Sequence, residues 1–227
     1  MVFDMDGLML DTEPLYKLAW QSACAGLGYH LSDALYVGFV GRPTPDCEGR
    51  LIEEFGSAFP LEAFRREWPA LWRAAATERG IRVKSGLLEL LAFLHERSVP
   101  IAVATSSEAE FTAFSLRQAG LAGRFATFVT GDQVALGKPA PDIYLRAAEQ
   151  LGVPPERCVA LEDSEAGIVA ACAAGMVALL IPDWVPASDV AARAAAYVMP
   201  SLVEARNVIA ELAADASSSH EQRVRAE

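Results

Sequence analysis

The hydrophobic positions of this chain follow two different periods, one in its first third and another after it. Between residues 14 and 81, apolar side chains such as Leu15, Ala19 and Ala23 recur every three or four positions, as on the inner face of a helix. From Val83 onward, short apolar runs alternate with helical stretches. The first pattern predicts a block of helices, and the second predicts a parallel sheet with helices on both faces.

Four helices are predicted in the helical block. Pro14 suits a first helical turn, Ser32 is a typical helix cap, and glycines follow the first two helices. The fourth helix contains Pro69, which is expected to kink or interrupt it. The predicted helices span residues 15–27, 32–41, 44–55 and 61–79.

The remainder of the chain predicts alternating strands and helices. Strands are expected where short runs are apolar and rich in β-branched residues, and helices where the period is longer. A short strand also opens the chain just before Asp4 and is expected to join the same sheet, because it cannot stand alone. The predicted strands span residues 99–105, 125–130, 158–161, 177–181 and 197–199, and the helices span 86–97, 107–119, 141–151, 165–174 and 202–212.

This order makes the helical block an insertion between the first strand and the rest of the sheet. We expect an α/β protein whose sheet domain comprises residues 1–13 and 82–214, with a helical cap of residues 14–81 above the carboxyl ends of the strands. Residues 215–227 are polar without an apolar period, and disorder is predicted for them. The few residues before Asp4 suggest that the natural amino terminus lies upstream of Met1.

The composition excludes several classes of protein. With 227 residues and 52% hydrophobic content, the chain can bury a substantial core. The net charge of -11 argues against a nucleic-acid-binding surface. No leader peptide and no membrane-spanning apolar stretch are recognisable, so a cytoplasmic, monomeric protein is expected. The four cysteines show no metal-ligand or C-x-x-C spacing and are expected to be buried free thiols, with disulfides as the alternative.

Residues that can carry chemistry follow four of the predicted strands. Asp4 and Asp6 alternate at the end of the first strand, so both carboxylates can face one point before Gly7 turns the chain. Taken alone, this pair fits a metal site, a nucleophile with an acid/base partner, or a solvated loop with an Asx turn. It also resembles the start of a calcium loop, but the later acidic ligands are missing.

Two further strand ends suit a phosphate group. Thr105, Ser106 and Ser107 open a helix, where hydroxyls and backbone N–H groups can bind an anion, although an ordinary helix cap is the alternative. Lys138 lies between a glycine and a proline just before a helix. It is either a charge held in position for a phosphoryl group or a surface lysine.

The fourth strand end carries adjacent acids. Glu162 and Asp163 follow the strand 158–161, where burial of a carboxylate is costly unless it is paired or bound to a cation; a helix cap by Asp163 or Ser164 is the alternative. Together the strand ends supply four carboxylates, a lysine and a cluster of hydroxyls. This combination indicates magnesium and a phosphoryl group, because magnesium prefers carboxylate, water and phosphate oxygens.

These motifs, in this order, resemble those of the haloacid dehalogenase superfamily of phosphohydrolases. The helical insertion is similar to that of the branch containing β-phosphoglucomutase and small sugar-phosphate or phosphoglycolate phosphatases. The resemblance extends from Val2 to about Leu212 and implies a Rossmann-like core with an α-helical cap. The matching motifs are Asp4-Met5-Asp6-Gly7, Asp11-Thr12-Glu13-Pro14, Thr105-Ser106-Ser107, Gly137-Lys138-Pro139-Ala140-Pro141-Asp142 and Leu161-Glu162-Asp163-Ser164.

The resemblance also implies a role for each site residue. Asp4 would be the nucleophile that forms an aspartyl-phosphate, and Asp6 would protonate the leaving oxygen and later deprotonate water. The residues implied to bind Mg²⁺ are Asp4, Asp6 (also through its backbone carbonyl), Glu162 and Asp163. The residues implied to hold the phosphoryl oxygens are Thr105, Ser106 and Lys138.

The expected activity is therefore magnesium-dependent hydrolysis of a small phosphorylated metabolite. Asp6 argues against dehalogenation, because dehalogenases of this type generally lack an acid there. A phosphomutase remains the alternative, but such mutases have a histidine that aligns with Tyr16 and basic or amide residues where this chain has Glu108 and Ala109. A non-catalytic binding protein is expected to have lost an essential group, and none is missing here.

Two residues of the predicted cap are candidates for contact with the substrate. Arg42 matches a cap loop that reaches over the active site in such proteins, with a solvent-facing arginine as the alternative. Tyr16 either lines the pocket or packs beneath the cap. Four aromatic residues at helical spacing are expected to form the cap core instead, namely Trp20, Phe64, Trp68 and Trp72.

Overall fold

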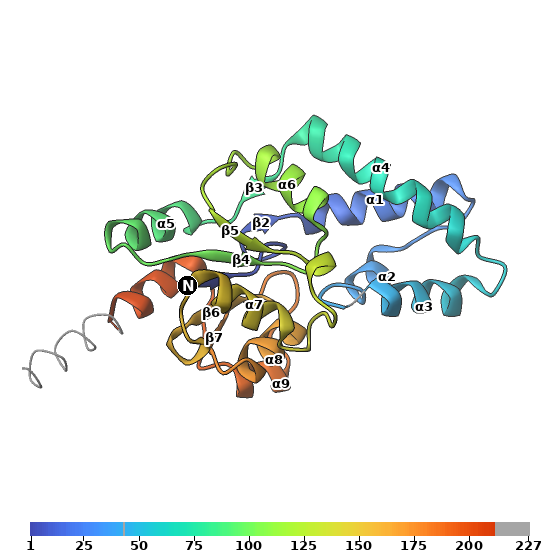
Figure 1. Ribbon diagram of the computed structural model, residues 1–227. Coiled ribbons are helices and arrows are strands. Elements are labelled where there is room, and N and C mark those ends of the chain that lie inside the picture. Colours follow the sequence, from blue (N-terminus) through green and yellow to red (C-terminus); the bar gives the residue numbers. More distant parts are fainter. Residues whose placement is uncertain (43, 212–227) are drawn as a thin grey trace, which may run out of the picture.

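The computed structural model describes residues 1–42 and 44–211. Within them, parallel strands form one six-stranded sheet in the order β5, β4, β1, β6, β7, β8 (Figure 1). This is the parallel sheet that the apolar runs predicted. The strands are β1 (Val2–Phe3), β4 (Ala102–Ala104), β5 (Thr127–Val129), β6 (Val159–Glu162), β7 (Val177–Leu180) and β8 (Tyr197–Val198).

The shortest of the central strands, β1, is held from both sides. Val2 pairs with Ala102 of β4 and with Ala160 of β6, and its side chain is fully buried. The backbone N–H of Asp4 donates a hydrogen bond to the carbonyl oxygen of Leu161 at 3.0 Å. Although β1 has only two residues, the backbone at Asp4 is therefore held firmly in the middle of the sheet.

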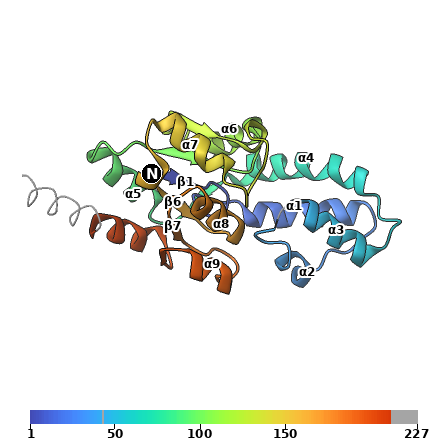
Figure 2. The same ribbon diagram turned by 60° about the horizontal axis from the view of Figure 1, so that its bottom comes forward.

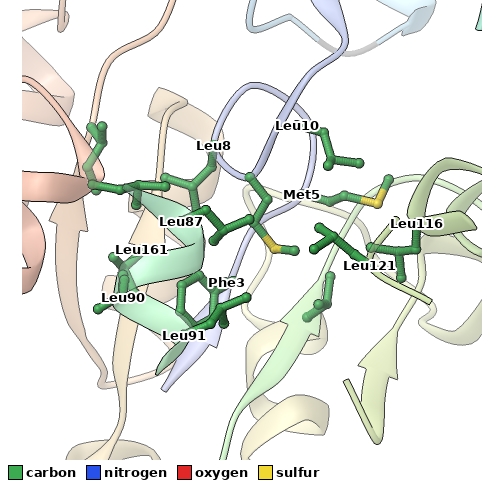
Figure 3. Close-up of a cluster of buried hydrophobic side chains, with 14 of the residues drawn as sticks. Phe3, Met5, Leu8, Leu10, Leu87, Leu90, Leu91, Leu116, Leu121 and Leu161 are labelled. Atoms are coloured by element: carbon green, nitrogen blue, oxygen red, sulfur yellow. The ribbon is translucent and has the colours of Figure 1, made fainter. Parts of the chain in front are cut away.

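Helices cover both faces of the sheet. Alternate strand side chains, such as Phe3 and Leu161, pack on one side against α5 (Leu87–Glu96), α6 (Ala109–Gln118) and the helical residues 202–211 (Figure 3). The other face packs against α7 (Asp142–Leu151), α8 (Glu165–Ala173) and α9 (Asp189–Ala194). Because both faces of the sheet are covered, the strand sequences are mostly apolar.

The helical block also forms as predicted, with α1 (Glu13–Gly26), α2 (Asp33–Val37), α3 (Thr44–Phe55) and α4 (Leu61–Arg79). Helices α1 and α4 lie side by side and extend away from the sheet, and α2 and α3 lie against their outer part (Figures 1 and 2). The block has a core of its own, which includes Trp20, Tyr36 and Phe64. The structure is thus a parallel α/β core with an inserted helical cap.

Some local predictions were wrong. Helix α4 runs without a break through Pro69, because residues on both sides of the proline pack on α1. Phe64, before the proline, contacts Trp20, and Trp72, after it, contacts Tyr16. Helix α2 is capped by Ser32, whose hydroxyl accepts from the N–H of Leu35 at 3.2 Å, but it ends at Val37 instead of residue 41. The short, alanine-rich α9 was not predicted, because it has no clear apolar period.

A two-stranded ladder beside the sheet was not predicted either. β2 (Leu10–Asp11) pairs antiparallel with β3 (Arg82–Val83). An ion pair of 2.6 Å between Arg82 and Asp11 reinforces the ladder. Because β2 leads into α1 and β3 follows α4, the two connections between sheet and helical block lie next to each other.

In the part of the chain that the structure describes, no helix combines the length and the apolar character needed to cross a membrane. All four cysteines are free, as predicted, but Cys172 is exposed and not buried, so that part of the prediction was wrong. Residues 215–227, for which disorder was predicted, lie outside the described residues, as does the last residue of the predicted helix 202–212.

Candidate active site

The carboxyl ends of neighbouring strands bring the predicted site residues together. Asp4 follows β1, Thr105 follows β4, and Glu162 is the last residue of β6. Lys138, from the loop before α7, donates hydrogen bonds to Asp4 Oδ1, to Glu162 Oε1 at 2.5 Å and to the carbonyl oxygen of Ala104 at 3.1 Å. One ammonium group therefore joins the ends of three strands.

The carboxylates around Lys138 keep its side chain protonated and positively charged. Its side chain is only 6% exposed, so it is not a surface lysine. Burial opposes the charged form, but the carboxylates of Asp4 and Glu162 outweigh this effect and raise the pKa of Lys138 above its ordinary value. All three N–H donors of the ammonium have acceptors. A permanent positive charge therefore stands beside Asp4.

The Asp4 carboxyl is difficult to ionise without further positive charge. Burial raises its pKa to about 8, although Lys138 lowers it, and the nearby Glu162 carboxylate adds to the increase. A carboxylate must be ionised to act as a nucleophile. A bound cation would favour the ionised form of Asp4 at neutral pH.

The donors around Asp4 fit a hard divalent cation. Carboxylate oxygens of Asp4, Glu162 and Asp163 lie within 4.8 Å of one another. Burial is the main reason why the pKa of Asp163 is raised well above its ordinary value, and the charges of Asp4 and Glu162 add to it. Several buried carboxylates in one place need a cation to be stable together. Oxygen donors of this kind suit Mg²⁺.

Glu162 is already bonded through both of its oxygens. Oε1 accepts from Lys138 and from the hydroxyl of Tyr144 at 2.6 Å. Oε2 accepts from the backbone N–H of Asp163 and from the N–H and hydroxyl of Ser164, at 3.0 to 3.2 Å. The fully buried Glu162 thus orients the loop that carries Asp163. Tyr144 was not identified from the sequence, because nothing near it marks it as a site residue.

Helix α8 leaves space for the Glu162 carboxylate at Gly167. A Cβ atom added to Gly167 would lie 1.8 to 2.3 Å from the carboxylate atoms of Glu162, a distance at which atoms overlap. Ser164 caps this helix by accepting from the N–H of Gly167 at 3.1 Å. Glycine at this position is therefore required by the site.

We expect Gly167→Ala to displace Glu162 and to lower the free energy of unfolding by about 1–3 kcal/mol, as overpacking usually does. Urea unfolding measures the change. Gly49→Ala in α3 is the matched control, because no atom would lie within 4 Å of the added methyl group. That variant should be stabilised by about 0.5–1 kcal/mol, since alanine is the better helix former. Equal changes in the two variants would contradict the close contact with Glu162.

The side chain of Asp6 is not part of the acidic cluster and faces the hydroxyl motif. Its Oδ2 accepts from the Ser107 hydroxyl at 2.9 Å, while its buried Oδ1 has no partner among the described residues. Burial raises the pKa of Asp6, although the bond from Ser107 lowers it. A carboxyl group with a raised pKa can hold a proton for transfer. The sequence suggested phosphate contacts for this motif but not the bond from Ser107 to Asp6.

The two other hydroxyls of the motif have different surroundings. Thr105 is buried, and its Oγ1 accepts from the N–H of Ser107 at 3.1 Å. Ser106 is exposed and lines a cavity. The structure thus places all three residues at the end of β4, and their contact with a phosphoryl group remains a prediction.

The cavity lies between the helical cap and the end of β4 and has a volume of about 590 Å³, which suits a small molecule. Asp6 is one of the residues that line this cavity. Its walls are aromatic, and charged side chains line it as well. The aromatic residues are Tyr16, Trp20, Tyr36, Phe39, Trp68 and Phe111, and the charged ones besides Asp6 are Glu13, Arg42, Arg73, Glu108 and Glu110.

Both predicted cap residues border this cavity. Tyr16 stacks on Phe111 of α6 with ring centres 6.1 Å apart, so it joins the cap to the core as well as lining the pocket. Arg42 is exposed at the cavity wall. Of the four aromatic residues assigned to the cap core, Phe64 is fully buried there, whereas the fully buried Trp72 belongs to the main core cluster instead. The other two, Trp20 and Trp68, pack in the same cap core but also line the cavity, so that prediction was incomplete.

Glu13 is a cavity residue that the sequence analysis did not select. It begins α1, and its Oε2 accepts a hydrogen bond from the Tyr36 hydroxyl at 2.9 Å. Burial raises the pKa of Glu13 to about 7, although the bond from Tyr36 lowers it. The only signal in the sequence was its place within the motif Asp11-Thr12-Glu13-Pro14, where an acid also suits a helix start.

The raised pKa of Glu13 predicts a pH dependence of stability. Between its ordinary pKa of 4.5 and about 7, Glu13 holds a proton in the folded protein but not in the unfolded chain. Stability therefore falls as pH rises through this window. Glu13→Gln, which does not titrate, should lose this part of the slope. At about 1.4 kcal/mol per pKa unit, the variant should gain up to about 3 kcal/mol relative to the wild type between pH 4.5 and pH 8.

Urea unfolding at pH 4.5 and pH 8 measures this difference. Glu53→Gln, at an exposed position of α3, is the control and should follow the wild-type profile. Parallel profiles for Glu13→Gln and the wild type would show that Glu13 titrates normally in the folded protein.

The fold and the site together define an α/β protein with a helical cap, in which carboxylates and a buried lysine gather at the carboxyl ends of the strands. A family model described as haloacid dehalogenase-like hydrolase matches residues 1–175. The chain belongs to this hydrolase family, as the strand-end motifs predicted.

Curated relatives agree with this assignment. The chain is 34% identical over 175 residues to a phosphorylated carbohydrates phosphatase of Thermotoga maritima, covering 77% of this chain and 81% of that protein. It is also 34% identical over 179 residues to the fructose-1-phosphate phosphatase YqaB of Escherichia coli, covering 79% and 94%. These relatives confirm the predicted enzyme class, a phosphoric monoester hydrolase.

Solved structures confirm the predicted fold. A structure named "putative beta-phosphoglucomutase from Thermotoga maritima" has a TM-score of 0.78 and 31% sequence identity, covering 92% of this chain and 97% of that one. The structure of CbbY from Rhodobacter sphaeroides in complex with phosphate has a TM-score of 0.77 and 28% identity, covering 89% and 94%.

Proposed function

We propose that this protein is a magnesium-dependent phosphatase that hydrolyses small phosphorylated metabolites, of the sugar-phosphate or phosphoglycolate type, through an aspartyl-phosphate on Asp4. The observation that carries the proposal is the position of Asp4, which accepts a hydrogen bond from Lys138 and lies within 4.8 Å of a carboxylate oxygen of Asp163. Asp6, two residues further along the chain, lines the cavity. The names of the relatives, a phosphatase of phosphorylated carbohydrates and one of fructose 1-phosphate, support the substrate class.

The chemistry proceeds in two displacements. A carboxylate oxygen of Asp4 attacks phosphorus, the bond from phosphorus to the ester oxygen breaks, and Asp6 gives its proton to that oxygen. Asp6 then takes a proton from the water that attacks the aspartyl-phosphate, which releases inorganic phosphate and restores Asp4. Lys138, Thr105 and Ser106 hold the phosphoryl oxygens throughout.

Magnesium would be held by Asp4, Asp163 and the backbone carbonyl of Asp6, with Glu162 beside them. When bound, it supplies positive charge that reduces the repulsion between the Asp4 carboxylate and a dianionic phosphate. The aromatic walls of the cavity suit the apolar faces of a sugar ring, and Arg42 suits a second anionic group. A monomer in the cytoplasm, with a core of residues 1–13 and 82–214 and a cap of residues 14–81, remains part of the proposal.

A phosphomutase is the second candidate, because a solved structure bearing that name resembles the chain. The cavity favours hydrolysis. Tyr16 packs against Phe111 where such mutases have a histidine, and no histidine lines the cavity formed by the described residues. Dehalogenation remains less favoured because of Asp6, and a non-catalytic role because no essential group is missing.

The test is a screen for release of inorganic phosphate by the purified chain. The panel contains fructose 1-phosphate, glucose 1- and 6-phosphate, phosphoglycolate and a nucleoside 5′-monophosphate, each with Mg²⁺ or with EDTA. We expect release only with Mg²⁺ and preference for one of the non-nucleotide esters. Conversion of glucose 1-phosphate to glucose 6-phosphate without phosphate release, followed by ³¹P NMR, would instead identify a mutase. Full activity in EDTA would overturn the proposed cofactor.

A further inference from the structure

A carboxylate outside the four predicted motifs also faces the acidic centre. Asp183 lies in the loop after β7, the strand next to β6, and its side chain is only 10% exposed. Its Oδ1 accepts a hydrogen bond from the ammonium of Lys84. Its Oδ2 is buried and has no hydrogen-bond partner among the described residues. A buried carboxylate oxygen without a partner is costly and calls for an explanation.

The free oxygen of Asp183 lies against the same turn as Asp163. The turn is made by Gly7, whose φ of +82° favours glycine. A Cβ atom added to Gly7 would lie 2.1 Å from Asp163 Oδ2 and 3.5 Å from Asp183 Oδ2. Both oxygens therefore approach one point, and only glycine leaves room there for Asp163.

Asp183 is not one of the three acids whose oxygens lie within 4.8 Å of one another. Its oxygen is close to that cluster but outside it. Magnesium keeps several water molecules when it binds to proteins, and outer carboxylates orient such ligands by hydrogen bonding. An acceptor at this place, with no donor from the described residues, suits a water molecule on the cation.

We propose that Asp183 is a positioning residue of the cation site, whose Oδ2 accepts a hydrogen bond from a water molecule bound to the metal. The inference rests on the magnesium site of the proposed function and extends it to a residue that none of the four motifs contains.

Lys84 and Asp183 should have opposite effects on cation binding. The backbone N–H of Lys84 donates to the carbonyl oxygen of Met9 at 2.9 Å, so the ladder next to the sheet fixes where its side chain starts. The ammonium neutralises Asp183 but repels a divalent cation nearby. Loss of Asp183 should therefore weaken cation binding, whereas loss of Lys84 should strengthen it. An ion pair remote from the cation would not give effects of opposite sign.

The experiment is isothermal titration of Mg²⁺ into the full chain without substrate, at pH 7.5 and low salt. Asp183→Asn should raise the Kd for Mg²⁺ about tenfold or more, as loss of an outer-sphere partner does. Lys84→Gln should lower the Kd by roughly threefold, because a repelling charge is removed. Asp189→Asn, an exposed acid in the first turn of α9, makes the same change of charge and should leave the Kd within about twofold of the wild-type value.

Thermal unfolding in EDTA separates stability from binding. If both variants unfold at lower temperature but bind Mg²⁺ as the wild type does, the pair is structural and the inference is wrong. If Asp183→Asn does not fold, an unchanged or raised Kd for Lys84→Gln is enough to overturn the inference. A wild-type chain that binds no divalent cation would overturn both the inference and the proposed cofactor. If the wild type binds Mg²⁺ and Asp183→Asn binds it with an unchanged Kd, only the inference is overturned and the proposed cofactor stands.

Discussion

Asp4→Asn is expected to abolish phosphate release, with kcat lower by roughly four orders of magnitude or more, because a neutral amide does not attack phosphorus. The side chain keeps its shape, and Lys138 keeps the acceptors on Glu162 and Ala104, so the variant should fold. Phosphate release measures kcat. Mass spectrometry of acid-quenched enzyme should find a phosphorylated protein only when Asp4 is present.

The control for this experiment is Asp189→Asn, an exposed acid on α9 that should retain full activity. Residual activity in Asp4→Asn must be compared with the fraction of chain that has reverted to aspartate by deamidation. If a variant free of such reversion kept a tenth or more of the wild-type kcat, Asp4 would not be the nucleophile.

Lys138→Met should have the largest effect on stability. Methionine keeps the length of the side chain but leaves two buried carboxylates, Asp4 and Glu162, without their shared cation. Loss of one partner from a buried ion pair costs about 3–5 kcal/mol. The pKa of Asp4, already raised to about 8 by burial, should rise further when Lys138 is removed. Phosphate release should also fall steeply.

The stability loss should depend on pH in a defined direction. An acid with a raised pKa holds its proton in the folded state while the unfolded chain has lost it, so stability falls as pH rises through that interval. The deficit of Lys138→Met should therefore be smaller at pH 5 than at pH 8. Urea unfolding in EDTA at both pH values measures it. The control is Lys17→Met, whose lysine pairs with the largely exposed Asp33; its effect should be small at both pH values. A deficit that shrinks toward pH 8 would contradict the assigned role of Lys138.

The sequence was sufficient to predict the parts of the site that depend on local patterns. Asp4 and Asp6 alternate directly after a strand, and Glu162 and Asp163 follow another. Because the carboxyl ends of parallel strands meet at one edge of a sheet, the predicted topology alone brings these residues together. Lys138 was marked by the restrained loop that carries it. The whole parallel sheet followed from the alternation of apolar runs with helices.

Other features depend on contacts between segments that are distant in the chain, and no local sequence pattern predicts them. Lys84 and Asp183 meet although they are 99 positions apart in the chain. The β2–β3 ladder has two residues in each strand, too few for an alternating pattern. Helix α4 passes through Pro69 because packing against α1 outweighs the helix-breaking tendency of proline, which a sequence pattern alone does not reveal.

The β2–β3 ladder has a consequence for how this protein can be engineered. Asp11 and Arg82 are cross-strand partners, so the chain leaves the sheet domain and returns to it at the same spot. A two-residue turn could join the strands as a hairpin in place of the entire cap. The shortened chain would uncover apolar surface that now touches Leu15 and Trp72 of the cap, which belong to the main core cluster. Any replacement for the cap must therefore present an apolar surface of its own to the sheet domain, and its shape would then set the size of the substrate.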